Sequence, residues 1–133
     1  MVFVDSNVPM YVAGRDHPLR DPARRFLERA QAGAVDICTS TEVLQEILYR
    51  YAALARLDLA ASVYDLFVQL CPTVLPVTLA DTDRAKSLLV SVRGISARDA
   101  VHAAVMRNHD IGDIATFDEG FDRIDGIARV RFQ

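Results

Sequence analysis

The chain has 133 residues, of which 51% are hydrophobic and 25% are charged. This balance indicates one globular domain, over residues 1–133, and excludes a disordered chain. Its apolar runs are far shorter than the roughly 18 residues that a membrane span needs, and Val2–Val4 is too short for the core of a signal peptide. We therefore expect a cytoplasmic protein that does not contact a membrane, in which Cys38 and Cys71 are buried free thiols.

The net charge of −3 argues against a passive nucleic-acid coat protein, since such proteins are normally basic. It does not exclude an enzyme that binds nucleic acid through a metal ion. Lys86 is the only lysine, and all other basic residues apart from histidine are arginines. Arginine suits bidentate contact with phosphate, although a GC-rich genome would produce the same bias without any function.

Strands alternate with helices along the chain, which predicts an α/β fold with a mainly parallel sheet. In chain order, we predict a strand at 2–4, a short helix containing Pro9, a helix from Asp21-Pro22 to Gly33, a strand at 35–38, helices at 42–55 and 57–70, a strand at 74–77, helices at 81–92 and 96–109, a strand at 114–116, a turn at 117–120 and a final strand at 128–132. Pro76 places the strand at 74–77 at an edge. Alternating apolar and polar residues predict a half-exposed final strand.

Four carboxylates occupy informative positions in this pattern. Asp5 and Asp118 each follow a predicted strand, and sites in open α/β sheets form outside the carboxyl ends of the strands. Asp99 lies in the first turn of a helix, where the helix dipole tolerates a negative charge. Glu46 lies at the flank of the apolar stripe of the helix at 42–55.

Each of these acids also has an ordinary structural interpretation. Asp5 and Asp99 can serve as helix caps, the latter in a capping box with Ser96. Asp118 can be a turn residue, and Glu46 can be a solvated residue on a helix flank. Asp122 and Asp125 are most simply surface or turn residues.

Taken together, the acids favour a metal site. Carboxylates that converge without a basic partner repel one another unless a cation compensates their charge. Oxygen ligands select Mg²⁺ or Mn²⁺, and such an ion assists the hydrolysis of phosphodiesters. The pattern therefore predicts metal-assisted phosphodiester hydrolysis at the strand ends.

The opening segment, Val-Phe-Val-Asp5-Ser-Asn7-Val-x-x-Tyr11, resembles the start of PIN-domain nucleases, in particular the VapC-type toxins of bacterial toxin–antitoxin pairs. Three later segments resemble the family's further acidic motifs in the same order: Thr39-Ser-Thr-Glu-Val-Leu-Gln-Glu46-Ile, Arg98-Asp99-Ala-Val-His102-Ala-Ala and Ala115-Thr116-Phe-Asp118-Glu-Gly-Phe121-Asp122. The four segments span nearly the whole chain. The resemblance implies a PIN-like three-layer α/β/α fold around a central, mainly parallel sheet.

The resemblance also implies roles for the acidic residues. Asp5 and Asp99 would be the metal ligands, for Mg²⁺ or Mn²⁺. Glu46 would complete the site through water or by orienting the attacking water, and Asp118 would be the fourth acid, with Asp122 able to assist or substitute.

Other residues receive supporting roles from the same resemblance. Asn7 and Thr116 would hold the carboxylates by hydrogen bonds, and Ser6 is a weaker candidate for this role. His102 is expected to be a packed helix residue rather than a base, and His17 and His109 are expected to be solvated.

The implied reaction is endonucleolytic cleavage of RNA, in which water attacks the phosphorus and the 3′-oxygen leaves. Arginines that can steer the RNA backbone are Arg15, Arg20, Arg24, Arg25 and Arg98. The implied partners are a cognate antitoxin, whose basic side chain would enter the acidic site, and a second copy of the chain. The apolar residues of the helices at 42–70 can supply the homodimer interface, although the core competes for them.

Two other classes remain as alternatives. A haloacid-dehalogenase-like phosphatase needs a second aspartate where Asn7 stands, and a receiver domain needs a lysine at a late strand end, whereas Lys86 lies within a predicted helix. Both enzymes are therefore disfavoured. The main alternative is a non-catalytic α/β binding module, in which the acidic residues are structural and the protein sequesters a partner.

Overall fold

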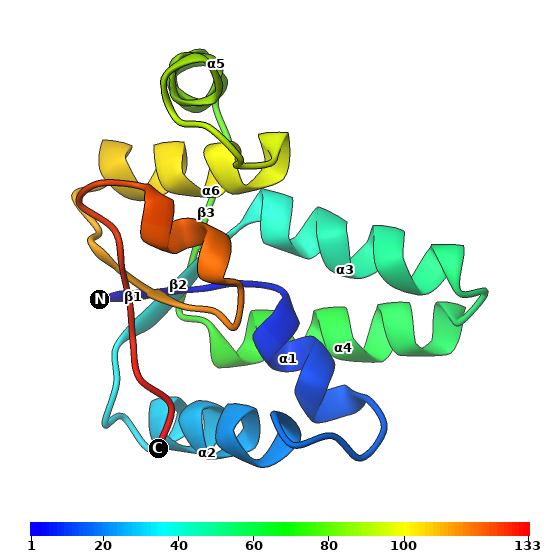
Figure 1. Cartoon of the computed structure of the whole chain (residues 1–133). Helices are drawn as coiled ribbons and strands as arrows, with labels where there is room; N and C mark the ends of the chain where they lie inside the picture. Colours follow the sequence, from blue (N-terminus) through cyan, green and yellow to red (C-terminus); the bar gives the residue numbers. More distant parts are fainter.

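The computed structural model describes all 133 residues and contains one sheet of five parallel strands, in the order β3-β2-β1-β4-β5 (Figure 1). The strands are β1 (Val2–Val4), β2 (Ile37–Ser40), β3 (Thr73–Leu75), β4 (Asp113–Ala115) and β5 (Ala128–Arg129). The helices are α1 (Asn7–Ala13), α2 (Arg20–Gln31), α3 (Thr41–Ala53), α4 (Leu57–Leu70), α5 (Leu79–Ser91) and α6 (Ala97–Asn108), with a short 3₁₀ helix, η1 (Glu119–Arg123). The predicted α/β fold with a parallel sheet is confirmed.

Helices cover both faces of the sheet, which gives the three-layer arrangement. Figure 1 shows α5 and α6 on one side and α1, α2 and α4 on the other, while α3 and α4 run side by side past the carboxyl ends of the strands. No helix has the length and apolar character required to cross a bilayer. Cys38 and Cys71 are buried free thiols, as predicted.

The central strand β1 determines where a site can form. Phe3 is paired in register with Cys38 on β2 and with Ile114 on β4, and all three side chains are buried. The chain continues from β1 to β2 on one side, whereas β4 lies on the other side of β1. The strand order therefore reverses between β1 and β4, and a crevice is expected outside their carboxyl ends. The Asp5 amide donates a hydrogen bond to the Ala115 carbonyl, 3.0 Å away, which extends this pairing to the crevice.

Two serines set the starts of the helices that carry acidic residues. The Ser40 hydroxyl accepts the Val43 amide hydrogen at the start of α3, which makes it the N-cap. The Ser96 hydroxyl likewise accepts the Asp99 amide hydrogen at the start of α6, at 3.1 Å. The Asp99 carboxylate does not return a bond to the Ser96 amide, so the predicted capping box is only half formed. That carboxylate is therefore available to the site.

The structure differs from the predicted elements near the carboxyl terminus. Only Ala128 and Arg129 of the predicted strand at 128–132 pair with β4. The Val130 amide still donates to the Ile114 carbonyl at 2.9 Å, and beyond it the Phe132 ring stacks on Phe117 with 4.1 Å between ring centroids. The last two residues of the predicted turn at 117–120 already belong to η1, for which Asp118 is the N-cap.

Candidate active site

A cleft of about 780 Å³ opens at the carboxyl ends of β1 and β4. Its walls come from α1, the loop that follows α1, α3 and the start of α6. The four acids predicted from the sequence all line this cleft: Asp5, Glu46, Asp99 and Asp118. Residues from four separate segments of the chain are therefore brought to one place.

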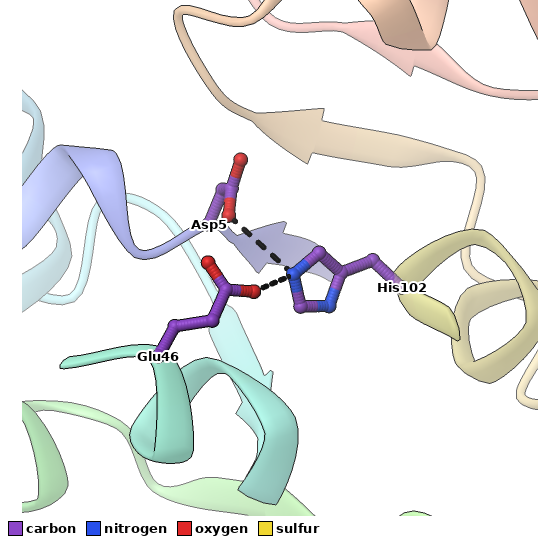
Figure 2. Close-up of side chains that lie close together, drawn as sticks. All are labelled: Asp5, Glu46 and His102. Atoms are coloured by element: carbon purple, nitrogen blue, oxygen red, sulfur yellow. Dashed lines mark hydrogen bonds and ion pairs between the residues drawn. The ribbon is translucent and has the colours of Figure 1, made fainter. Parts of the chain in front are cut away.

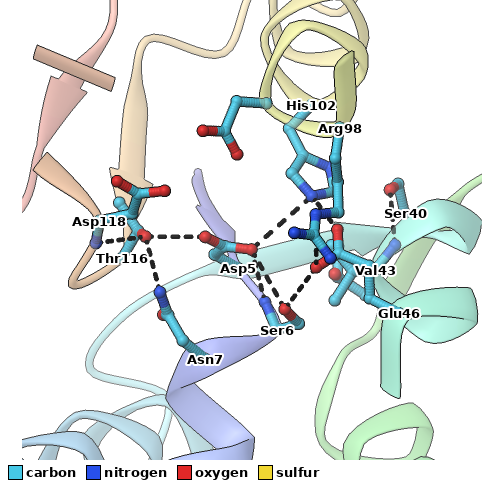
Figure 3. A network of polar contacts seen from close by, with 12 residues as sticks. Asp5, Ser6, Asn7, Ser40, Val43, Glu46, Arg98, His102, Thr116 and Asp118 are labelled. Carbon is cyan, nitrogen blue, oxygen red and sulfur yellow. Dashed lines mark hydrogen bonds and ion pairs between the residues drawn. The ribbon is translucent and has the colours of Figure 1, made fainter. Parts of the chain in front are cut away.

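Asp5 lies at the bottom of the cleft, directly after β1, and its residue is only 5% exposed. The backbone amide of Ser6 donates to Asp5 Oδ1 at 2.7 Å, and the Thr116 hydroxyl donates to Asp5 Oδ2 at 2.7 Å (Figure 3). Burial raises the pKa of this carboxyl above its ordinary value, although His102 and Thr116 partly oppose the shift. Both carboxylate oxygens are thus held in fixed directions.

Glu46 projects from the middle of α3 and is buried, not solvated. The Ser6 hydroxyl donates to Glu46 Oε2 at 2.8 Å, and Arg98 Nε lies 3.6 Å from the same oxygen. The other carboxylate oxygen, Oε1, is hydrogen-bonded to His102 Nε2 (Figure 2). Each oxygen of this buried acid therefore has a polar partner.

His102 on α6 is packed in the interior, as predicted, but it also contacts two acids of the site, which the sequence did not reveal. Its Nε2 lies 3.7 Å from Asp5 Oδ1 in addition to bonding Glu46, and its Nδ1 has no hydrogen-bond partner. Burial lowers the pKa of His102, but the bond to Glu46 and the surrounding carboxylates raise it more, so that it lies above the ordinary value. The one available signal was the spacing of three residues from Asp99, which places the two on neighbouring positions of a helix.

Asp99 and Asp118 lie close together on the other side of the cleft. A Cβ atom added to Gly120 would lie 3.1 Å from Asp118 Oδ1 and 3.5 Å from Asp99 Oδ2, so both carboxylates border the space beside this glycine. Burial and the charges of Asp118 and Asp5 raise the pKa of Asp99 to about 6. Asp118 Oδ1 accepts the Gly120 amide hydrogen at 2.8 Å, whereas no side chain of opposite charge pairs with either acid.

Thr116 and Asn7 connect the strand ends. The Thr116 hydroxyl accepts hydrogen bonds from Asn7 Nδ2 and from the Asp118 amide, both at 3.1 Å, while it donates to Asp5 (Figure 3). Asn7 Oδ1 accepts the Phe117 amide hydrogen at 3.4 Å. This network fixes the loop after β4 against the end of β1.

The structure does not bring Asp122 into the cleft. Its carboxylate forms a bidentate ion pair with Arg129, with both N–O distances 2.9 Å, and it lies on the surface.

Arg15 and Arg98 line the cleft, as a role in binding a phosphate backbone requires. By contrast, Arg20 and Arg24 pair with nearby acids on their own segment.

The donor set fits a divalent cation. Carboxylate oxygens of Asp5 and Glu46 lie within 4.8 Å of each other, and Asp99 and Asp118 border the same cleft. Burial, followed by the charges of Asp118 and Asp5, raises the pKa of Asp99, and a bound cation would offset the negative charge that these acids share. Carboxylate oxygens are the ligands that Mg²⁺ and Mn²⁺ prefer.

The sequence model of the PIN-domain family matches residues 2–127 of the chain. The chain belongs to the PIN-domain family. It is 42% identical over 130 residues to ribonuclease VapC13 of Mycobacterium tuberculosis, covering 98% of this chain and 99% of that protein. Its fold is similar to that of Mycobacterium tuberculosis VapC20, described as a sarcin-ricin loop cleaving toxin, with a TM-score of 0.81 and 25% identity over 98% of this chain and 99% of that one. A chain in a structure described as a toxin–antitoxin complex from Klebsiella pneumoniae has a similar fold, with a TM-score of 0.69 and 15% identity over 96% of each chain.

Proposed function

We propose that this PIN-domain protein is a metal-dependent endoribonuclease and the toxin of a toxin–antitoxin pair. The observation that carries the proposal is the convergence of Asp5, Glu46, Asp99 and Asp118 in one cleft. Its 42% identity to a protein named as a VapC ribonuclease supports RNA as the substrate. The arginines Arg15 and Arg98 on the cleft walls suit a phosphate backbone.

In this proposal, Asp5 and Asp99 hold the ion, with Asp118 on the same side of the cleft and Glu46 facing it from α3. The ion is Mg²⁺, with Mn²⁺ as a substitute, because an oxygen donor set suits both. His102 is not assigned as a ligand, since its Nε2 is hydrogen-bonded to Glu46. When bound, the cation screens the charge of the phosphodiester and makes water a better nucleophile.

The chain's own residues orient the participants in the reaction. Ser6 and Thr116 fix the two oxygens of Asp5, and His102 and Arg98 offset the charge of Glu46. An arginine on the cleft wall binds a phosphate oxygen of the RNA. The attacking water loses a proton as its oxygen bonds to phosphorus, the bond from phosphorus to the 3′-oxygen breaks, and the leaving oxygen takes up a proton.

The proposed partners are an antitoxin protein and a second copy of the chain. The Klebsiella pneumoniae structure of the same fold is a toxin–antitoxin complex, which supports the first partner. Exposed leucines on α3 and α4, among them Leu48, Leu57 and Leu66, support an apolar contact with another chain. We place the protein in the cytoplasm, where an RNA substrate is present.

The test is cleavage of RNA and of DNA by the purified protein, with added Mg²⁺ or with EDTA. We expect cleavage of RNA that requires the ion and is lost in Asp5→Asn, while the circular dichroism spectrum of the variant is unchanged. RNA cleavage that persists in EDTA would contradict the metal dependence. If no RNA is cleaved and no divalent ion raises the melting temperature, the binding-module alternative holds instead.

A further inference from the structure

Aromatic and basic side chains line the walls of the cleft above its acidic floor. On α1, the residues that face the cleft recur at helical spacing: Asn7, Met10, Tyr11 and, at the end of the helix, Gly14. On α3, the corresponding residues are Glu46, Tyr49 and Arg50. The loop after α1 adds Arg15 and His17. Each wall therefore carries at least one aromatic ring and one arginine.

The ring of His17 is the exposed end of a column of packed rings. It lies on Tyr11 with 4.8 Å between centroids and an interplanar angle of 35°. Tyr11 packs against the edge of Phe117 at 5.3 Å, and Phe117 stacks on Phe132 at 4.1 Å. Phe117 itself lies between two residues of the site, Thr116 and Asp118. The column is thus joined to the loop that carries the fourth acid.

A hydrogen bond also fixes the orientation of the exposed ring. His17 Nδ1 accepts the Leu19 amide hydrogen at 3.1 Å, so in the neutral ring the proton is on Nε2. Nε2 has no partner within the protein and can donate to a ligand. A ring fixed in this way contributes a flat contact surface with little loss of conformational freedom on binding.

We propose that the His17–Tyr11 ring pair is a stacking platform for one unpaired base of the RNA, an inference that rests on the proposed ribonuclease function. A base has a flat face that stacks on aromatic side chains, and neighbouring arginines hold the adjacent phosphate. Arg15, two residues before His17 and in the same cleft, supplies that cation. The base must be unpaired, because the face of a base in a duplex is covered by its neighbours.

The size of the cleft and the unpaired arginines on its walls favour RNA over a protein segment as the occupant of this platform. A volume of about 780 Å³ lies in the range of pockets that hold small ligands, which matches a short stretch of single strand. Arg15 and Arg50 line the walls without an acidic partner within salt-bridge distance, as anionic phosphates require.

The test measures KM and kcat on a single-stranded RNA oligonucleotide that contains a site cut by the protein, mapped first on total RNA. We expect His17→Ala to raise KM about tenfold with little change in kcat, because stacking on an aromatic ring contributes that much for one base. His17→Phe, which keeps a ring but not the bond to Leu19, should stay within about twofold of the native KM. His109→Ala replaces an exposed histidine outside the cleft and serves as the matched control.

A second measurement identifies the base. Abasic nucleotides are placed one at a time around the cut site, and one position should raise the KM of the native protein but not that of His17→Ala. An unchanged KM in His17→Ala, or the absence of any such position, would overturn the platform while RNA cleavage by the native protein still stands. Loss of inhibition by an antitoxin with an unchanged KM would assign the rings to a protein contact and overturn it too. Failure of the native protein to cleave any RNA would instead refute the proposed function.

Discussion

His102 Nε2 on α6 is hydrogen-bonded to Glu46 Oε1 on α3, and this buried contact joins two helices that border the cleft. The imidazole also lies 3.7 Å from Asp5 Oδ1, so one side chain faces two of the four acids. Because its other nitrogen has no partner, the polar contacts of His102 are all directed at the site. The histidine thus offsets negative charge within the protein itself, at the base of the acidic cluster.

Replacing His102 tests this relationship. We expect His102→Ala to lower the free energy of unfolding by about 1–3 kcal/mol, because it leaves a buried carboxylate without one of its donors and opens a cavity. In a Glu46→Gln background the same change should cost less, since the charge that the imidazole compensates is already gone. Thermal melting in EDTA of the four proteins of this cycle measures the coupling. Strictly additive losses would show that His102 contributes only packing.

The raised pKa of Asp99 predicts how stability depends on pH. The pKa of Asp99 is about 6 in the folded protein and exceeds the 3.8 of an ordinary aspartate, so the folded state holds the proton of Asp99 more tightly than the unfolded state. The contribution of this proton to the free energy of unfolding is complete below about pH 4 and is lost as the pH rises through 6. Asp99→Asn removes this loss. In EDTA, we expect the variant to equal the native protein at pH 4 and to be more stable at pH 7 by about 1 kcal/mol, a value discounted for the partial exposure of Asp99.

Melting curves between pH 4 and pH 7 check this prediction. The matched control is Asp122→Asn, because Arg129 holds the pKa of Asp122 below its ordinary value, and this variant should show no gain at pH 7. A difference between Asp99→Asn and the native protein that does not grow with pH would contradict the assigned cause of the shift.

Much of the fold could be predicted because local patterns and tertiary structure agree. The strand Val2–Val4 is apolar at each position, as a central parallel strand requires, and Ser40, of a residue type favoured at N-caps, caps α3. The predicted edge strand is β3, at the edge of the sheet. The length of the final strand could not be predicted, because the stacking of Phe132 on Phe117 involves residues 15 positions apart in the sequence.

The sequence could predict the part of the candidate site in which the position of an acid depends only on the strand that precedes it. Asp5 and Asp118 each follow a predicted strand, so the two acids meet if those strands are neighbours, and the structure pairs β1 with β4. The environment of Glu46 could not be predicted, because the burial of its side chain depends on how α3 packs against α6. The same packing sets the contact of His102 with Glu46, and a single sequence contains no signal for the distance between two helices.

Glu46→Gln separates a role at the metal site from a role in packing. The substitution keeps the shape of the side chain but removes its charge, so we expect the rate of RNA cleavage at limiting Mg²⁺ to fall about tenfold and to recover in part at saturating Mg²⁺. Glu28→Gln, on the exposed surface of α2, is the matched control and should leave the rate unchanged. An equal loss of rate at low and high Mg²⁺ would show that Glu46 does not act through metal affinity.

Asp5→Asn gives a test of metal binding that does not depend on activity. For the native protein, a divalent ion at about 100 times its dissociation constant should add about 2.7 kcal/mol to the free energy of unfolding, because the ion binds only the folded state. Asp5→Asn should lose this gain, since its carboxylate lies at the bottom of the cleft and both oxygens are fixed toward the site. Asp122→Asn, which changes a surface acid in the same chemical way, should keep it. Thermal melting with Mn²⁺ and with Mg²⁺ measures both effects, and an equal gain in Asp5→Asn and the native protein would place the ion elsewhere.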